Sequence, residues 1–218
     1  MAGTSTSKRA DERGEEPAAR ERILQAALGA FMENGYATAS TLEIATRARV
    51  SKRELYALVG TKQEMLIACI SERAKRLDVP AQFPVVEDRE TLAEVLAAFG
   101  TTLIREVSDP SVIAVFRLAI AEAVQAPEVA EALNSIGREA SRTALRTIMS
   151  RAQAAGLIAG RPAELAERFS GLLWGDLMVS LLLGVAERPS ARAIAQRARE
   201  AAAAFLRLHP PLHGAPAD

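Results

Sequence analysis

The feature of this sequence that most restricts its fold is a series of three capping-box motifs spaced about ten residues apart. In a capping box, a Ser or Thr ahead of a helix accepts a hydrogen bond from the amide three residues later. A Glu at that later position reaches back to the amide of the cap residue. The pairs are Ser40 with Glu43, Ser51 with Glu54, and Thr61 with Glu64. Apolar residues at helical spacing follow each pair, so the sequence predicts two helices of about two turns and a longer one ending near Val79.

Nearly all of the remaining chain also has the apolar period of a helix. A first helix precedes the capping motifs and ends near Gly35, a residue suited to a helix C-cap. Beyond Pro80 we expect five further helices, and no stretch alternates in the manner of a strand. One of them, over about Ala163–Val185, is apolar almost all round, which is typical of a helix buried on several sides. The sequence therefore predicts an all-α fold of about nine helices.

These helices divide into two predicted domains. Residues 1–19 are polar and lack an apolar period, so we expect a disordered segment there. Residues 20–79 form the first helical domain, and Pro80 and Pro84 mark a link to a larger helical domain over residues 80–208. Residues 209–218 are rich in Pro and Gly and predict a second disordered segment.

Residue usage argues against an enzyme, a metal site or a cofactor. The two histidines, His209 and His213, both lie in the Pro-rich tail, so the body has no His for a catalytic triad or a metal. Cys69 lies on an apolar helix face and is interpreted as a core residue rather than a sensor thiol. The most apolar stretch, residues 171–185, is shorter than the roughly 20 residues that span a bilayer. We therefore expect a cytoplasmic protein without membrane contact.

The two short helices, over about 41–48 and 52–59, are the pattern that points to function. About three residues separate them, which suits a helix-turn-helix within a three-helix N-terminal domain. Each is too short to be stable alone in water, so both must pack on their neighbours. Between Thr41 and Lys62 the chain has five basic residues and two acidic ones, although the whole chain is neutral. A positive patch of this kind fits phosphate contact, and the alternative is an ordinary solvated helix face.

In a helix-turn-helix the start of the second helix lies closest to the base edges of duplex DNA. Lys52 and Arg53 occupy that position here and are suited to donate to guanine. Glu54 either accepts from cytosine or completes its capping box. Tyr56 either reaches a phosphate or is a partly buried ring, and Lys62 stands where a cation and helix amides both favour phosphate.

The start of the first short helix offers further candidates. The amides and hydroxyls of Ser40 and Thr41 either hold a phosphate or only cap the helix, and Arg47 is expected to be exposed for backbone or base contact. The expected DNA-binding residues are Ser40, Thr41, Arg47, Ser51, Lys52, Arg53, Glu54, Tyr56 and Lys62. A dimer would present two such helices to successive half-sites, which predicts a near-palindromic double-stranded operator.

Several short motifs in this region resemble the DNA-binding domain of TetR-family transcriptional repressors. The motifs are Gly35-Tyr36, Ser40–Ala45, Val50–Lys52, Leu55-Tyr56 and Thr61–Glu64, within a match from about Arg20 to Ile70. The resemblance implies that the third helix reads the major groove and that Tyr56 and Lys62 touch phosphate. The rest of the chain resembles the AefR-like C-terminal domain of that family, most clearly from Phe116–Glu122 through Pro189-Ser190 to Phe205-Leu206. That implies a helical dimerisation and effector-binding domain.

The sequence departs from the family pattern at the turn and at the base-reading end. Arg49 stands where the family usually has Gly. Either Arg49 takes a left-handed backbone conformation, at a cost of roughly 1 kcal/mol, or the turn differs. Arg53 and Glu54 replace residues that are usually small, so the end expected to read bases is unusually charged.

The larger domain is expected to dimerise and to bind an effector. Its last two helices would pair with their symmetry mates in a four-helix interface. Large apolar residues, with one Arg, are candidates for a pocket that takes a small apolar ligand. They are Phe99, Leu103, Phe116, Arg117, Ile120, Met149, Phe169, Trp174 and Met178. The alternative is that they are ordinary core residues.

The function predicted from the sequence is a dimeric, sequence-specific DNA-binding regulator, a repressor that an apolar ligand releases from its operator. The alternative is a helical interaction module or apolar-ligand carrier whose helix-turn-helix is only structural. A third possibility, an all-helical enzyme that uses the apolar pocket, is disfavoured by the residue usage above.

Overall fold

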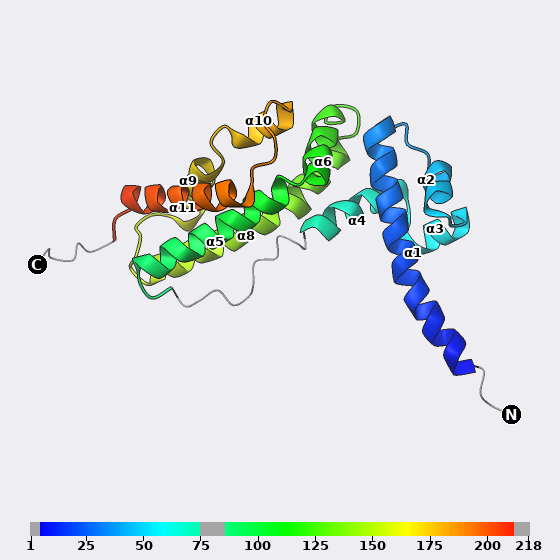
Figure 1. Cartoon of the computed structure of the whole chain (residues 1–218), viewed down its shortest axis with the longest axis horizontal. Helices are drawn as coiled ribbons and strands as arrows, with labels where there is room; N and C mark the ends of the chain where they lie inside the picture. Colours follow the sequence, from blue (N-terminus) through cyan, green and yellow to red (C-terminus); the bar gives the residue numbers. More distant parts are fainter. Residues whose placement is uncertain (1–4, 75–85, 212–218) are drawn as a thin grey trace, which may run out of the picture. The chain divides into compact units, whose positions relative to one another are not determined.

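The computed structural model describes residues 5–74 and 86–211, all of them in helices or the loops that join helices (Figure 1). No strand occurs within these two ranges, which confirms the all-α prediction. The expected Pro-rich link and residues 212–218 of the expected tail lie outside the described residues. No described helix is long and apolar enough to cross a membrane.

The chain forms two compact units whose border differs from the predicted one. The first unit comprises Met1–Arg73 and Ala114–Ile136, and the second comprises Ala74–Ile113 and Gly137–Asp218. Residues 114–136 were predicted to belong to the second domain, because they follow the Pro-rich link in the sequence. Their apolar side chains, including Val115, Leu118 and Val129, instead share a hydrophobic core with the N-terminal helices.

Six helical elements lie wholly or mainly in the first unit. They are α1 (Ser5–Asn34), α2 (Thr41–Ala48), α3 (Lys52–Val59), α4 (Lys62–Ala74), the greater part of α6 (Pro110–Ala121), and α7 (Pro127–Ala132). A π-helical segment, η2 (Leu133–Arg138), continues from α7. Ile23 and Phe31 of α1 are fully buried, as are Ile44 of α2 and Leu55 of α3, so the two short helices rest on α1. Cys69 is buried in the same core, as its position on an apolar face predicted.

Helix α1 begins earlier than the sequence analysis expected. Residues 1–19 were predicted to be disordered, but the helix starts at Ser5 and continues without a break to Asn34. The added segment has little apolar surface to bury, and it is rich in Ala, Glu and Arg, which have high helix propensity. The prediction of disorder relied on the lack of an apolar period, and a helix can form without one.

The three capping motifs all mark helix starts, but only one is a complete box. Thr61 donates its amide to Glu64 at 2.7 Å and its hydroxyl accepts from the Glu64 amide at 3.3 Å. Hydrogen bonding of the Glu64 carboxyl to Thr61, first to its backbone amide and then to its side chain, lowers the pKa of that carboxyl. Ser51 accepts from the Glu54 amide at 3.1 Å, which is half of the box. Ser40 accepts from the amide of Leu42, one position earlier than the box requires.

Arg49 occupies the turn between α2 and α3 in a left-handed conformation. Its φ is 57° and its ψ is 45°, and among the described residues it is the one non-glycine residue with positive φ. Its amide donates to the Thr46 carbonyl at 3.2 Å and the Val50 amide donates to the Ala45 carbonyl at 3.0 Å. The turn therefore has the left-handed geometry that glycine adopts without a steric penalty, and Arg49 adopts the less favourable conformation.

The second unit is a packed set of longer helices. It contains α5 (Arg89–Val107), α8 (Glu139–Ala154), α9 (Pro162–Trp174), α10 (Leu177–Leu183) and α11 (Ala191–Leu208). Helices α5 and α11 approach closely at Gly100, where a Cβ atom would lie 2.8 Å from Leu173 and 3.3 Å from Ala198. On α11, Ala198, Ala201 and Ala202 are buried, because only small side chains fit such an approach.

The helix expected over Ala163–Val185 is divided in two at Gly175. Helix α9 ends there with a glycine φ of 46°, and α10 begins two residues later. Arg197 of α11 donates to the carbonyls of Leu173 and Trp174, at 3.1 and 3.3 Å, so the carbonyls freed by the break have a donor. Arg197 is distant in sequence, which is why apolar spacing alone predicted one helix.

The C-terminal end of α11 is held by Arg89 at the start of α5. The Arg89 guanidinium donates to the carbonyls of Leu157, Leu206 and His209, at 2.6, 2.5 and 2.9 Å. His209 was predicted to belong to the disordered tail, but it is buried and its ring lies 4.6 Å from that of Phe205. Burial lowers the pKa of His209, and the charge of Arg168 adds to this effect.

Replacing Arg49 by Gly is expected to raise the free energy of unfolding by about 1 kcal/mol, because Gly takes positive φ without a Cβ penalty. Urea denaturation of the full chain measures the change. The matched control is Arg53→Gly, which makes the same chemical change inside α3 and should lower the free energy of unfolding by about 1 kcal/mol. Equal signs for the two variants would contradict the assignment of strain to Arg49.

Candidate nucleic-acid interface

Helices α2 and α3 are positioned as a helix-turn-helix on α1. Helix α2 packs through Ile44, Ala45 and Ala48. The Thr41 hydroxyl at the start of α2 lies 3.4 Å from the Tyr56 hydroxyl on α3, so the start of α2 adjoins the exposed face of α3. The start of α2 and the exposed face of α3 therefore meet at these two hydroxyls.

Most side chains in the first two turns of α3 are exposed, and Leu55 is the buried residue among them. Leu55 is fully buried, whereas Lys52, Arg53 and Glu54 are exposed. Tyr56 is 44% exposed, and the Lys52 ammonium lies 6.0 Å from the centre of its ring. The side chains expected at the base-reading end therefore reach solvent, and Tyr56 has its hydroxyl on the outer surface.

Within the described residues, the cations at this surface are not neutralised by carboxylates. Arg49, Lys52 and Arg53 form no ion pair there. The Glu54 carboxylate accepts no hydrogen bond from the Ser51 amide, so it is not used as a cap. The result is a local positive charge around the start of α3.

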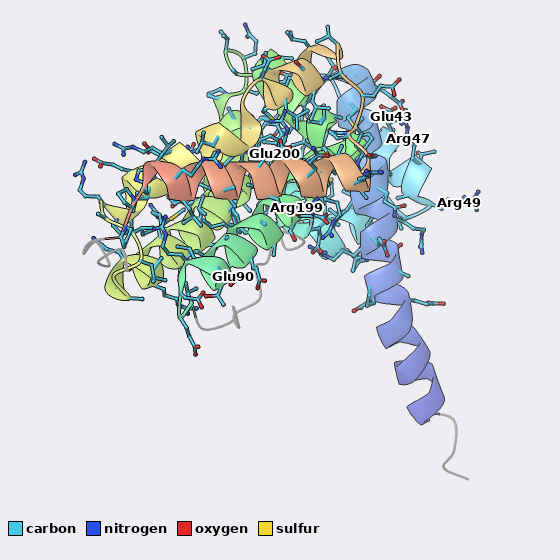
Figure 2. All side chains as sticks on the ribbon, turned by 60° about the vertical axis from the view of Figure 1, so that its left-hand side comes forward. Glu43, Arg47, Arg49, Glu90, Arg199 and Glu200 are labelled. Atoms are coloured by element: carbon cyan, nitrogen blue, oxygen red, sulfur yellow. The ribbon has the colours of Figure 1, made fainter. Side chains whose placement is uncertain are left out.

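Arg47 is arranged differently from these residues. Its guanidinium lies 2.6 Å from the carboxylates of both Glu33 and Glu43, and Figure 2 shows Glu43 and Arg47 close together. The hydrogen bond from Arg47 lowers the pKa of the Glu33 carboxyl. Asn34 also donates to Glu43, at 3.0 and 3.2 Å. Arg47, a candidate DNA contact, is thus placed in a cluster that ties α2 to the end of α1.

Lys62, the expected phosphate contact at the start of α4, holds the turn that follows α1. Its ammonium donates to the carbonyls of Tyr36 and Ala37 at 2.8 and 3.0 Å, and lies 4.7 Å from the centre of the Tyr36 ring. An ammonium has three donors, so one remains for another acceptor. Ser40 and Ser51 are the N-cap residues of α2 and α3, and Thr41 is the first residue of α2.

The same turn is held from its other side by Glu122, a residue that the sequence analysis did not connect with it. The Tyr36 amide donates to the Glu122 carboxylate at 2.9 Å, across 86 residues of sequence. Gly35, with φ of 79°, leaves room for this carboxylate, since a Cβ there would lie 3.0 Å from it. Burial raises the pKa of Tyr36, and the charges of Glu128 and Glu122 add to this effect.

The nine candidate ligand residues do not belong to one unit. Phe116, Arg117 and Ile120 lie in the first unit, and Ile120 is 62% exposed. The others lie in the second unit, where Met149 and Phe169 are fully buried and Trp174 and Met178 are partly buried. Phe169 packs edge-to-face on Phe205 with ring centres 5.7 Å apart, as core aromatics do.

A helix-turn-helix with an exposed, cationic second helix on an all-helical body defines the chain as a helix-turn-helix regulator. Two family models match it. Residues 23–69 match the bacterial regulatory proteins of the TetR family, and residues 94–209 match the AefR-like transcriptional repressor C-terminal domain. The chain belongs to the TetR family of transcriptional regulators, and the resemblance seen in its sequence is confirmed.

Solved structures of this family are similar to the chain over most of its length. The flavonoid-responsive regulator FrrA is 26% identical, with a TM-score of 0.73, and the match covers 89% of this chain and 98% of that one. A TetR regulator from Agrobacterium tumefaciens is 27% identical, with a TM-score of 0.72 and coverage of 88% and 95%. A TetR-family regulator from Mesorhizobium loti is 25% identical, with a TM-score of 0.70 and coverage of 89% and 98%. No curated protein matches the chain significantly in sequence.

Removal of the Glu122 carboxylate is expected to loosen the turn after α1. Glu122→Ala leaves the Tyr36 amide without its acceptor and should lower the free energy of unfolding by about 1–2 kcal/mol. Glu122→Gln keeps an oxygen acceptor, so its free energy of unfolding should fall by less. Hydrogen exchange at the Tyr36 amide measures the effect, with Glu131→Ala, an exposed carboxylate on α7, as control. Unchanged exchange in Glu122→Ala would refute the role of this bond.

Proposed function

We propose that this TetR-family regulator is a homodimeric repressor that binds a near-palindromic operator and leaves it when a small, largely apolar ligand binds. The observation that carries the DNA-binding part is the exposed start of α3, with its unpaired cations beside the turn. A structural helix-turn-helix would have no need of exposed cations that make no ion pair within the described residues.

Within this proposal the exposed residues divide into two roles. Lys52 and Arg53 are suited to donate to guanine in the major groove, and Glu54, free of its capping bond, is available to accept from cytosine. Tyr56 and Lys62 are assigned to backbone phosphates, the latter through its remaining ammonium donor. Ser40, Thr41 and Ser51 add hydroxyls and helix-start amides, whereas Arg47 supports α2 through its ion pairs.

The proposed dimer forms through the last two predicted helices, which correspond to α9–α10 and α11. Apolar side chains on α10 and just beyond it are exposed in the single chain. Val179 is 52%, Leu183 is 71% and Val185 is 76% exposed. Clustered exposed apolar residues mark protein–protein contact, and a two-fold pairing of these helices would cover them.

The proposed ligand binds in the second unit, and its lining is drawn from Phe99, Leu103, Met149, Phe169, Trp174 and Met178. The name of FrrA, a flavonoid-responsive regulator of similar fold, supports a largely apolar effector for this chain. Ligand binding would favour a dimer whose two recognition helices no longer match the half-site spacing. Phe116, Arg117 and Ile120 are no longer part of the proposed lining, because they belong to the first unit.

The DNA-binding proposal is tested with the full chain and the duplex that flanks its own coding sequence. Fluorescence anisotropy should show that affinity falls steeply as salt rises. In a plot of log binding constant against log salt concentration, each phosphate contact should add about 0.9 to the downward slope. Arg53→Ala should reduce the preference for this duplex over random DNA. Arg151→Ala, an exposed arginine of α8, is the control.

A binding constant that hardly changes with salt would refute the phosphate contacts. In that case the chain is better explained as an interaction module or ligand carrier. If Arg53→Ala loses affinity equally for the flanking duplex and for random duplex DNA, Arg53 does not read bases.

A flavonoid added to the same assay should release the duplex, and retention of DNA at saturating flavonoid would argue against that effector class.

The dimer is tested by Leu183→Arg, which places a charge in the proposed apolar interface. Sedimentation velocity should show a monomer, and DNA affinity should fall about 100-fold or more because the two half-sites are no longer bound together. Val124→Arg, at an exposed apolar residue of the first unit, is the control and should remain dimeric. A dimeric Leu183→Arg protein would place the interface elsewhere.

A further inference from the structure

The Arg49 side chain takes no part in holding the turn that it occupies. The turn is closed by main-chain bonds from the Arg49 amide to the Thr46 carbonyl and from the Val50 amide to the Ala45 carbonyl. The preceding carbonyl, of Ala48, accepts from the Arg22 side chain at 3.3 Å. A glycine would supply the same main-chain bonds without the strain of positive φ. The fold therefore gains nothing visible from an arginine at this position.

Three other arginines of the first unit have partners within it, whereas Arg53, a candidate base reader, forms no ion pair with a described residue. Arg20 pairs with Glu72 at 3.2 Å, Arg22 donates to the Ala48 carbonyl, and Arg47 lies between two carboxylates. Arg49 forms no ion pair with a described residue, and its side chain is exposed. Figure 2 shows it extending outward from the turn between α2 and α3. The contrast suggests that its partner lies outside the protein.

Arg49 stands close to the start of the recognition helix. Ser51, the N-cap of α3, follows two residues later, and Lys52 and Arg53 come directly after it. An unpaired guanidinium here adds to the positive charge at the end of α3 that faces DNA in the proposed function. Strained backbone that persists although a simpler residue would remove the strain is an indication of function.

We propose that Arg49 binds a backbone phosphate of duplex DNA beside the groove that α3 enters. The inference rests on the proposed DNA-binding function and adds a contact that a glycine in the turn cannot make. A phosphate is favoured over a base because Arg49 lies in the turn, ahead of the helix that enters the groove, and guanidinium groups bind phosphate oxygens strongly. The contact would anchor the protein on DNA of any sequence.

The test compares Arg49→Gly and Arg49→Lys with the unaltered protein, on the flanking duplex and on random duplex DNA. Arg49→Gly should weaken the binding of both duplexes by similar factors, of about fivefold or more, since a charge-assisted hydrogen bond is lost. Its salt slope should fall by about 0.9 for each contact removed. Arg49→Lys keeps the charge and should retain the slope, and Arg151→Ala is the control for loss of an exposed arginine.

The outcomes separate this inference from the proposed function. If Arg49→Gly binds both duplexes as tightly as the unaltered protein, with the same salt slope, the phosphate contact is refuted while DNA binding stands. If the unaltered protein itself shows no salt-dependent binding, the proposed function fails first. Because Arg49→Gly is expected to be the more stable protein, a loss of affinity cannot be explained by unfolding.

Discussion

The burial of the apolar face of α1 is the constraint on which the DNA-binding half of this protein depends. Helices α2 and α3 have eight residues each, a length at which an isolated helix is not stable in water. They are stable because Ile44 and Leu55 are fully buried in the same hydrophobic core as Ile23 and Phe31 of α1. The exposed side chains of α3 are thus presented by a helix that is held in place through Leu55 on its opposite, apolar side.

The turn after α1 joins this core to a segment from the middle of the chain. Lys62 holds the carbonyls of the turn and Glu122 accepts the amide of Tyr36. Glu122 follows directly after α6, a helix that starts in the second unit and ends in the first. Glu122 and Lys62 thus fix the two sides of this turn, one from the end of α6 and the other from the start of α4.

The basic residues of the first unit fall into two groups, those that pair within it and those that are exposed at the start of α3. Arg20, Arg22 and Arg47 are used inside the first unit, where they join α1 to α4 and α2. Arg49, Lys52 and Arg53 are left without ion pairs among the described residues, at the one edge where α3 begins. A chain with no net charge can in this way present a locally cationic surface, because at this edge three basic side chains outnumber the single carboxylate of Glu54.

The sequence by itself determined the helical class, the starts of α2, α3 and α4 and the family, because these depend on residues a few positions apart. The capping motifs and the apolar period located α2, α3 and α4, and the glycine position occupied by Arg49 was identified as the place of possible strain. Only the tertiary structure decided which partners distant residues find. Arg47 meets Glu33, Glu122 meets Tyr36, Arg197 covers the carbonyls at the break before α10, and residues 114–136 join the first core. Contacts across tens of residues leave no local pattern, so neither the break in the helix nor the pairing of Arg47 could be read from spacing and composition.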